Sequence, residues 1–345
     1  MSTPFFTLVM PVYNAQDHIL KTLTSITTQT FRDYEVILIN DGSTDGSTQI
    51  IEKFIVDKSQ FKLINIENSG PGSARNHGIE YAKGTYLLFV DADDVLKKTA
   101  LNDRHDLLVE SETDLLISSY NMKVLDDGEV VNEKLTEAPD RTYQTQQDFK
   151  NDLFELMEKQ LLYVVWNKVY KVDIVRKNGI TFPPYRSCED RLFNLAYFEN
   201  VQQVKLVNQV LYEYYFDGRG GLTNKHFSNK FQTFVEFYEA CLKISQKDTK
   251  GFSALFLKGV MSSIIPIYSV STFTFKEKRR YIKEILHHDR VVQASKESLR
   301  NSLMRKVLAT VFKLKSVLLM YVTSWLLYKV SNTSPRFIEK IKGNF

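Results

Sequence analysis

Residues 87–96 read LLFVDADDVL, an apolar run that leads directly into three aspartates. The run at 87–90 is typical of a buried strand, whereas carboxylates resist burial unless a partner compensates their charge. Asp91, Asp93 and Asp94 lie within four residues and repel one another unless a cation lies among them. The order of the surrounding segments indicates why such a charged group follows an apolar strand.

Segments typical of strands and of helices alternate through the first part of the chain. Between the first two strands, Ile19, Leu23 and Ile26 recur at the spacing of one helix face. We expect Asn14 to cap that helix. The β-α-β-α-β-α-β order predicts an α/β fold of the Rossmann-like kind, with a mostly parallel sheet and helices on both faces. The predicted strands are 6–10, 35–40, 61–66 and 85–90.

Polar residues follow three of the predicted strands. They form the segments PVYN (11–14), DGSTD (41–45) and DADD (91–94). Ligands of parallel sheets bind beyond the carboxyl ends of the strands. We therefore expect the acidic group to lie at a ligand-facing edge of the sheet rather than in the core.

The later part of the chain predicts a change of architecture. Residues 114–125 are typical of a further strand, and residues 140–176 of mostly helical structure. A helix is expected to begin near Glu189, before one more strand and a glycine-rich loop. We therefore expect an α/β domain at 1–225 and a helical region at 226–345.

The composition is that of a globular chain and limits its class. Of 345 residues, 43% are hydrophobic and 25% are charged, and the formal net charge is only +4. No recognition motif accompanies the basic residues, so nucleic acid is not an expected partner. Cys188 and Cys241 are too few for a disulfide framework, which indicates reduced thiols in the cytoplasm. The N-terminus has no secretory signal pattern, and no run reaches the roughly 18 apolar residues of a spanning helix.

An acidic strand end suits a divalent cation. Mg²⁺ and Mn²⁺ prefer oxygen ligands, and Mg²⁺ usually takes one or two carboxylates and completes its shell with substrate phosphates and water. The Asp-x-Asp pattern of Asp91 and Asp93 would hold such an ion, which neutralises a diphosphate and stabilises it as a leaving group. The alternative is a solvated acidic turn before a helix. For Asp94 we favour that role, as a helix cap.

Six motifs follow one another along the chain: LVMPVYN (8–14), VILINDGSTDGS (36–47), NSGPGSARNHGIEYAKGTYLLFVDADD (68–94), VWNKVYK (165–171), NGITFP (178–183) and CEDRLFN (188–194). In this order they resemble the bacterial family 2 glycosyltransferases of the GT-A fold, over roughly residues 5–225. The resemblance implies an inverting transfer of a sugar from a nucleotide diphosphate donor, with a UDP-sugar expected. The acceptor would be a hydroxyl of a growing surface glycan, such as a capsular polysaccharide, exopolysaccharide or teichoic-acid-type polymer.

The resemblance also assigns residues to the donor. Tyr13 would hold the base, together with Pro11, because a tyrosine ring can stack on uracil. Asp41 would accept a hydrogen bond from the uracil N–H, since a carboxylate is only an acceptor. Asp93 would be the metal ligand, for Mg²⁺ or Mn²⁺. The remaining donor residues are Asn68 and Arg75 in the loop facing the donor, Asp91 near the ribose, and Arg219 in the glycine-rich loop.

The acid pair of Glu189 and Asp190 matches the family's catalytic acids. Asp190 is the expected general base, which takes the proton of the acceptor hydroxyl, and Glu189 would orient the acceptor or share that role. The local alternative is that both are first-turn acids stabilised by a helix dipole. Trp166, Asn167 and Lys168 match a segment beside the acceptor site. In the alternative interpretation, Trp166 is a core residue and Lys168 is solvated.

The segment 300–329 contains six basic residues and no acidic one, and its apolar residues recur every three or four positions. A basic amphipathic helix with aromatic residues suits an anionic membrane surface. The most apolar part, 316–328, is too short to cross a bilayer. Attachment to the inner face of the cell membrane would suit an acceptor carried on a lipid. The alternative is that the helix packs on the catalytic domain or on a second subunit, so an oligomer is possible.

Two other functions compete with this interpretation. A nucleotidyltransferase also uses carboxylate-bound Mg²⁺, but it needs a basic, glycine-rich triphosphate loop near the N-terminus, and PVYNAQDH (11–18) lacks one. A non-catalytic subunit that binds a nucleotide sugar or a polysaccharide and supports another transferase is the alternative from a different class. The intact acid pair argues against it, and donor hydrolysis by the isolated chain would distinguish the two.

Overall fold

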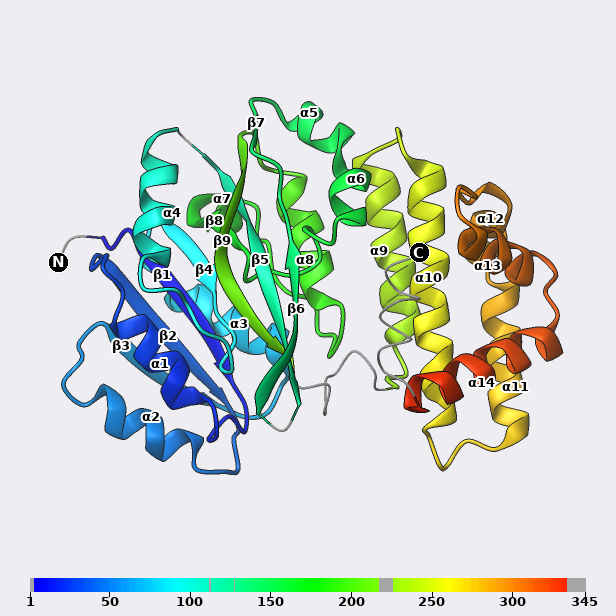
Figure 1. The fold of residues 1–345 in the computed structure, drawn as a ribbon, viewed down its shortest axis with the longest axis horizontal. Coiled ribbons are helices and arrows are strands. Elements are labelled where there is room, and N and C mark those ends of the chain that lie inside the picture. Colours follow the sequence, from blue (N-terminus) through cyan, green and yellow to red (C-terminus); the bar gives the residue numbers. More distant parts are fainter. Residues whose placement is uncertain (1–2, 112, 127, 217–225, 334–345) are drawn as a thin grey trace. The chain divides into compact units, whose positions relative to one another are not determined.

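The computed structural model describes residues 3–111, 113–126, 128–216 and 226–333. The chain divides into two compact units, Met1–Arg219 and Gly220–Phe345 (Figure 1). Of the described residues, those of the first unit form nine strands and several helices, and those of the second form only helices.

One nine-stranded sheet is the framework of the first unit. Its strands are β1 (Phe6–Val12), β2 (Tyr34–Asp41), β3 (Phe61–Ile66), β4 (Tyr86–Phe89), β5 (Leu115–Asp126), β6 (Glu129–Thr136), β7 (Arg141–Tyr143), β8 (Lys168–Lys171) and β9 (Val204–Phe216). The order is β3-β2-β1-β4-β8-β5-β9-β7, and β6 pairs with β5. Strands β1 to β4 are parallel, as predicted. Strand β8 joins the two halves of the sheet because it pairs antiparallel with both β4 and β5.

Helices cover both faces of the parallel strands. Helix α1 (Ile19–Thr27) packs in one apolar core with the face that presents Leu8. Helix α3 (Pro71–Tyr81) covers the other face, where Gly78 lies against Val9. A Cβ atom at Gly78 would lie 2.2 Å from Val9 Cγ1, so only glycine allows this approach of helix and strand. The fold class predicted from the sequence is confirmed.

Two local expectations for this unit are wrong. The first helix begins at Ile19 rather than near Asn14, whose backbone is left-handed with φ 48°. Asn14 Oδ1 accepts a hydrogen bond from the Thr44 N–H at 2.8 Å, which ties the loop after β1 to the loop after β2. The segment 140–176 is only partly helical, because pairing with neighbouring strands extends β7 and β8. The other helices of this unit are α2 (Ser47–Ile55), α4 (Ala100–Val109), α5 (Gln146–Asn151), α6 (Leu153–Glu158), α7 (Val172–Lys177) and α8 (Glu189–Phe198).

The described residues of the second unit, 226–333, form helices, as expected for the C-terminal region. The single basic helix predicted at 300–329 is wrong, because the chain breaks into two helices where Lys315 adopts φ 51°. A left-handed residue cannot continue a right-handed helix. The elements are α9 (Lys230–Ile244), α10 (Thr249–Ile264), the 3-10 helix η2 (Ile265–Tyr268), α11 (Phe275–His287), α12 (Asp289–Glu297), α13 (Leu303–Lys313) and α14 (Val317–Thr333).

One helical stretch of the described residues, Thr249–Tyr268, is long and apolar enough to cross a membrane. Of its most apolar window, 78% is buried inside the protein. Helix α10 within it packs against α9 and α12, as a core helix does. Its apolar composition is therefore explained by packing within the unit.

Candidate active site

Arg75 joins the acidic end of β4 to the acid pair of α8. Its Nη2 donates to Asp91 Oδ1 at 2.9 Å, and its Nη1 donates to Asp190 Oδ1 at 2.8 Å. Nη1 also lies 3.4 Å from Glu189 Oε1. Burial opposes the charge of this guanidinium, but the three carboxylates outweigh it and raise the pKa of Arg75 above its ordinary range. Side chains from three separate segments thus meet at one buried cation.

The glycines before α3 bring Arg75 to this position. Gly70 adopts φ 92°, a conformation that favours glycine, and the proline that follows begins the helix. A Cβ atom at Gly72 would lie 3.0 Å from Glu189 Cγ, so the first turn of α3 lies close against the acid pair. The guanidinium carbon of Arg75 lies 5.5 Å from the centre of the Phe182 ring, which covers one of its sides.

The acid pair occupies the first turn of α8. Cys188 before it adopts a left-handed φ of 68°, which is uncommon for a residue other than glycine and turns the chain sharply into the helix. Glu189 is 6% exposed and the Asp190 side chain is 20% exposed. Burial raises the pKa of Asp190 to about 7, because the charge of Arg75 only partly offsets it and the neighbouring carboxylates add repulsion. A pKa near neutral is what a general base requires at physiological pH.

The buried Asp94 anchors the acidic loop to β9. Its Oδ2 accepts a hydrogen bond from Tyr212 OH at 2.7 Å, and its Oδ1 accepts one from the Tyr215 N–H at 2.9 Å. The Tyr212 oxygen in turn accepts from the Asp91 N–H at 3.1 Å. Burial, with repulsion from Asp93 and Asp91, raises the pKa of Asp94 well above its ordinary value. The expected helix cap at Asp94 is therefore wrong: the residue positions the loop, and Asp93 is exposed beside it.

Tyr212 is a positioning residue that the sequence analysis missed. Its ring stacks on Trp166 with the centroids 4.6 Å apart, and Tyr214 stacks on the same indole at 5.2 Å. The sequence offered one signal: Tyr212 and Tyr214 are two positions apart, and alternate residues of a strand share one face. Trp166 is 4% exposed and belongs to the core behind the acidic loop.

Lys168 is fully buried, so the alternative of a solvated side chain is wrong. Its Nζ donates to Leu161 O at 2.7 Å, Val164 O at 2.6 Å and Asn167 Oδ1 at 2.8 Å. Burial lowers the pKa of Lys168 well below its ordinary value, and the charge of Asp190 opposes that shift. Three oxygen acceptors match the three N–H donors of an ammonium. Lys168 therefore holds the loop before β8, within electrostatic range of Asp190.

Asp41 ends β2 and fixes the loop that precedes α3. Its Oδ1 accepts from the Ser69 N–H at 2.7 Å, and its Oδ2 accepts from the Gly70 N–H at 2.9 Å. Asn68 Nδ2 donates to the backbone oxygen of Asp41 at 2.9 Å, and Asn68 Oδ1 accepts from Arg186 Nη2 at 3.1 Å. Asp41 is only 3% exposed. To bind Asp41, the N–H of a uracil base would therefore have to displace the Ser69 or Gly70 N–H, or share a carboxylate oxygen with it.

The remaining predicted donor residues lie at the end of β1 and in the glycine-rich loop. Pro11 is half-buried within β1, and Tyr13, just beyond the strand, is 54% exposed. An exposed ring at the carboxyl edge of the sheet is able to stack on a planar base. Arg219 lies outside the described residues.

The acidic edge has the donor chemistry of a site for a hard cation. Among the described residues, no three His, Cys, Asp or Glu side chains converge as a preformed metal cluster. A magnesium site does not need one, because one or two carboxylates suffice when substrate phosphates and water complete the shell. Asp91 engages Arg75 through Oδ1 and its side chain remains 26% exposed, next to the exposed Asp93. These two residues fit such an ion.

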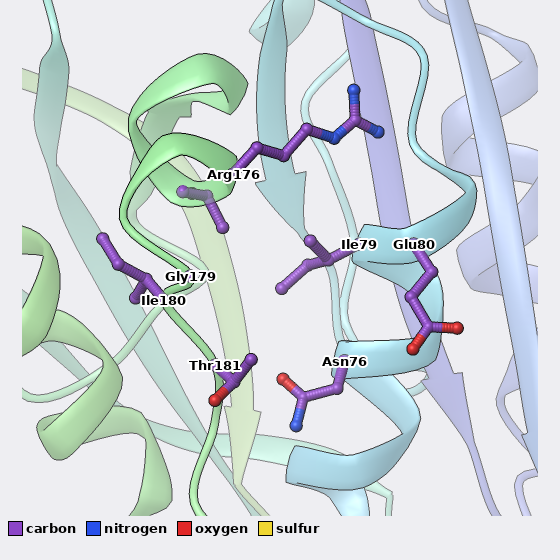
Figure 2. Close-up of a pocket in the computed structure, with 8 residues that line it drawn as sticks. Asn76, Ile79, Glu80, Arg176, Gly179, Ile180 and Thr181 are labelled. Atoms are coloured by element: carbon purple, nitrogen blue, oxygen red, sulfur yellow. The ribbon is translucent and has the colours of Figure 1, made fainter.

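A pocket of about 210 Å³ lies between α3 and α7 (Figure 2). In Figure 2 the side chains of Asn76 and Ile79 on α3 face α7 and the loop after it, whereas Glu80 extends away from them. None of the predicted donor, metal or catalytic residues lines it. Its lining residues are Asn76, Ile79, Glu80, Val175, Arg176, Gly179, Ile180 and Thr181.

Comparison with known proteins identifies the family. The family model of Glycosyl transferase family 2 matches residues 7–179. The uncharacterized glycosyltransferase EpsJ of Bacillus subtilis (strain 168) is 26% identical over 300 residues, which are 84% of this chain and 86% of EpsJ. The poly(ribitol-phosphate) beta-N-acetylglucosaminyltransferase TarS of Staphylococcus aureus (strain MW2) is 30% identical over 241 residues, 68% of this chain and 39% of TarS.

Solved structures share the fold. S. aureus TarS 1–349 in complex with UDP-GlcNAc aligns with a TM-score of 0.65 at 21% identity, over 95% of this chain and 91% of that one. The mannosyltransferase PcManGT from Pyrobaculum calidifontis, in complex with GDP-Man and Mn²⁺, aligns with a TM-score of 0.53 at 14% identity, over 91% and 88% of the two chains. At these identities the likeness shows the fold alone. With the family model matched over half of its length, the chain belongs to glycosyl transferase family 2, the glycosyltransferases of the GT-A fold.

Proposed function

We propose that the chain transfers a sugar, with inversion, from a UDP-sugar to a hydroxyl of a growing bacterial surface glycan. The observation that carries the proposal is the contact of Arg75 with Asp91 and Asp190, because it brings the expected donor acid and the expected base to one guanidinium. The complex of TarS with UDP-GlcNAc supports a UDP-sugar. The name of TarS, a poly(ribitol-phosphate) transferase, supports a surface polymer as acceptor, whether teichoic-acid-type, capsular or exopolysaccharide.

The donor would bind at the carboxyl ends of β1, β2 and β4. Tyr13 stacks on the uracil ring beside Pro11, and Asp41 accepts the base N–H in exchange for one of its loop donors. Asn68 lines the same loop, and Asp91 lies near the ribose. The exposure of Tyr13 and the position of these residues at one sheet edge support this arrangement.

Asp190 would act as the general base. The acceptor oxygen attacks the anomeric carbon, the bond from that carbon to the diphosphate oxygen breaks, and Asp190 takes the proton of the acceptor hydroxyl. Arg75 holds Asp190 Oδ1 and thereby fixes the orientation of the carboxylate, so Oδ2 is the oxygen assigned to the proton. Attack from the face opposite the leaving group inverts the anomeric centre. General-base assistance of this kind contributes about 10²–10⁴-fold.

Glu189 would support the base rather than replace it. It lies 3.4 Å from Arg75 Nη1 and is almost fully buried, whereas the Asp190 side chain keeps some exposed surface. The negative charge of Glu189 raises the pKa of Asp190. We assign Glu189 to orienting the acceptor and Arg75.

Asp93, together with Asp91, would hold a divalent cation, Mg²⁺ or Mn²⁺. When bound, such an ion neutralises the charge that develops on the diphosphate leaving group. The excess of carboxylates over basic side chains at this edge and the complex of PcManGT with Mn²⁺ support the assignment.

Neither Cys188 nor Cys241 forms a disulfide, which agrees with a cytoplasmic enzyme.

The proposal is tested by measuring nucleotide diphosphate release from a panel of UDP-sugars, with Mn²⁺ and surface-glycan acceptors. The wild-type chain should release UDP from at least one donor. Asp190→Asn should keep the thermal shift caused by donor binding but lose at least about 100-fold in transfer. Asp173→Asn, a change of an exposed acid on α7, is the control and should keep full activity.

Two results would contradict the proposal. One is near-normal turnover by Asp190→Asn, which removes the assigned base. The other is donor binding without any hydrolysis or transfer by the wild-type chain across the panel. That second result would favour a non-catalytic subunit that binds a nucleotide sugar or a polysaccharide for another transferase.

A further inference from the structure

The helices α13 and α14 carry an unusual share of the exposed apolar surface. Among the described residues, seventeen large hydrophobic side chains are exposed, and eight of them lie between residues 303 and 326. Single exposed apolar residues are common, but a concentrated set marks an interaction surface. We call this set the apolar stripe. Its members are Leu303, Val307, Leu314, Leu318, Leu319, Val322, Trp325 and Leu326.

The opposite side of α14 is already used for packing. Tyr268 OH is 2.8 Å from Tyr321 O and 2.7 Å from Ser324 Oγ, and its ring lies 5.7 Å from that of Tyr328. Phe275 of α11 contacts the Tyr321 ring at 5.1 Å. Helix α14 is therefore held against η2 and α11 along one side (Figure 1). By the helical spacing of about 100° per residue, the exposed stripe residues of α14 lie on its other side.

Positive charge accompanies the stripe. Residues 300–329 contain six basic side chains and no acidic one, and Lys306, Lys313 and Lys315 are exposed. Lys329 Nζ lies 5.8 Å from the centre of the Trp325 ring. Exposed leucines and a tryptophan flanked by lysines match the boundary between lipid headgroups and acyl chains.

We infer that the apolar stripe binds the surface of an anionic lipid bilayer. The helices lie on the surface instead of crossing it, because one side of α14 is packed against η2 and α11. The apolar part of α14, Val317–Val330, is also shorter than the roughly 20 residues of a spanning helix. A second copy of the chain is a poorer partner, because a symmetric contact would bring the same basic surface against itself. The inference does not depend on the assignment of donor, metal or base.

Vesicle binding of the full chain tests the inference. Flotation with phosphatidylcholine vesicles that contain about 30% phosphatidylglycerol should recover the protein, and pure phosphatidylcholine vesicles should recover much less. High salt should weaken the binding, because it screens the lysines. Equal recovery from both vesicle types at low salt would overturn the inference.

Variants separate the stripe from general surface charge. Each lysine near an anionic surface contributes about a fivefold factor in partitioning, so the loss of three predicts about 100-fold weaker binding. Two polar substitutions in the stripe should weaken binding at least about tenfold at both low and high salt. The test variants are the triple Lys306→Gln, Lys313→Gln, Lys315→Gln and the double Leu318→Gln, Leu326→Gln. The controls are Lys53→Gln, Lys83→Gln, Lys177→Gln and Val56→Gln, all at exposed positions of the first unit.

Tryptophan fluorescence reports the depth of contact. The chain has two tryptophans, of which Trp166 is buried and Trp325 is 41% exposed. Vesicles should shift the Trp325 emission to shorter wavelength, and brominated lipids should quench it. Unchanged emission on bound vesicles would overturn the inference. A second result would also overturn it: the wild-type chain sediments as a dimer, while the leucine double variant is monomeric and still binds vesicles like the wild type. The stripe would then be a contact between copies of the chain.

Discussion

Replacing Asp190 with asparagine should stabilise the protein above pH 7 while it removes transfer activity. In the folded protein burial raises the pKa of Asp190 from 3.8 to about 7. In the unfolded chain the carboxyl titrates near its ordinary value of about 3.9. The folded state therefore binds this proton more tightly than the unfolded state does. The contribution of Asp190 to the free energy of unfolding is fully present below about pH 4 and is lost as the pH rises to about 7.

The size of the effect follows from the pKa difference. A shift of about three units corresponds to about 4 kcal/mol, since one unit is about 1.4 kcal/mol. Asparagine cannot ionise and avoids this cost. Solvent reaches the side chain, which is 20% exposed, and the surroundings relax, so we expect a gain of about 1–3 kcal/mol at pH 8. At pH 5 Asp190 is still protonated in the folded protein, so most of this destabilisation is absent. The stabilisation by Asp190→Asn should then fall below about 1 kcal/mol.

Urea unfolding followed by tryptophan fluorescence measures this difference. A Trp325→Phe background leaves Trp166, which is buried in the first unit, as the only reporter. Asp173→Asn, at an exposed position of α7, is the control and should show no pH-dependent gain. If Asp190→Asn is no more stable than the parent at pH 8, the reasoning is refuted, because the ionised carboxylate would then not destabilise the folded state.

Three further substitutions test the fold and the site. Gly78→Ala should destabilise the protein by about 1–3 kcal/mol in urea unfolding, because its methyl group would overlap Val9, and adding Val9→Ala should recover part of the loss; an unchanged midpoint would show that α3 can move away. Tyr212→Phe should cost about 1–3 kcal/mol, since the buried Asp94 loses a hydrogen-bond donor, and should raise the KM for the donor; wild-type values for both would mean that the loop is held by other contacts. Asp93→Asn should weaken Mn²⁺ activation by at least about tenfold with UDP binding in the absence of metal unchanged, and an unaltered Mn²⁺ titration would remove Asp93 from the metal site.

The parallel part of the sheet could be predicted because its strands are buried on both faces. Such strands form continuous apolar runs, as in β2, and the turns after them carry recognisable polar residues. Strand β8 has only four residues, and its extension depends on pairing with β4 and β5, which no local pattern shows. The break between α13 and α14 was missed for a similar reason, because Lys315 has good intrinsic helix propensity.

The residue types of the site were predictable, but their partners were not. Arg75 was expected to face the donor, yet its contact with Asp190 joins residues 115 positions apart. Asp94 has the local pattern of a helix cap, and its role as a buried anchor depends on Tyr212 and Tyr215, more than 100 positions later in the sequence. Lys168 was weighed as a solvated side chain, because a buried lysine depends on carbonyl oxygens that the sequence does not display.

The pH dependence of kcat/KM for the acceptor tests most directly whether Arg75 links the donor acid to the base. The wild-type rate should rise with pH along a single acid limb with a midpoint near 7, as Asp190 ionises. In Arg75→Gln the loss of the neighbouring positive charge should move that midpoint upward. A wild-type rate that is flat from pH 5 to 8, or a limb that stays in place in Arg75→Gln, would contradict the account.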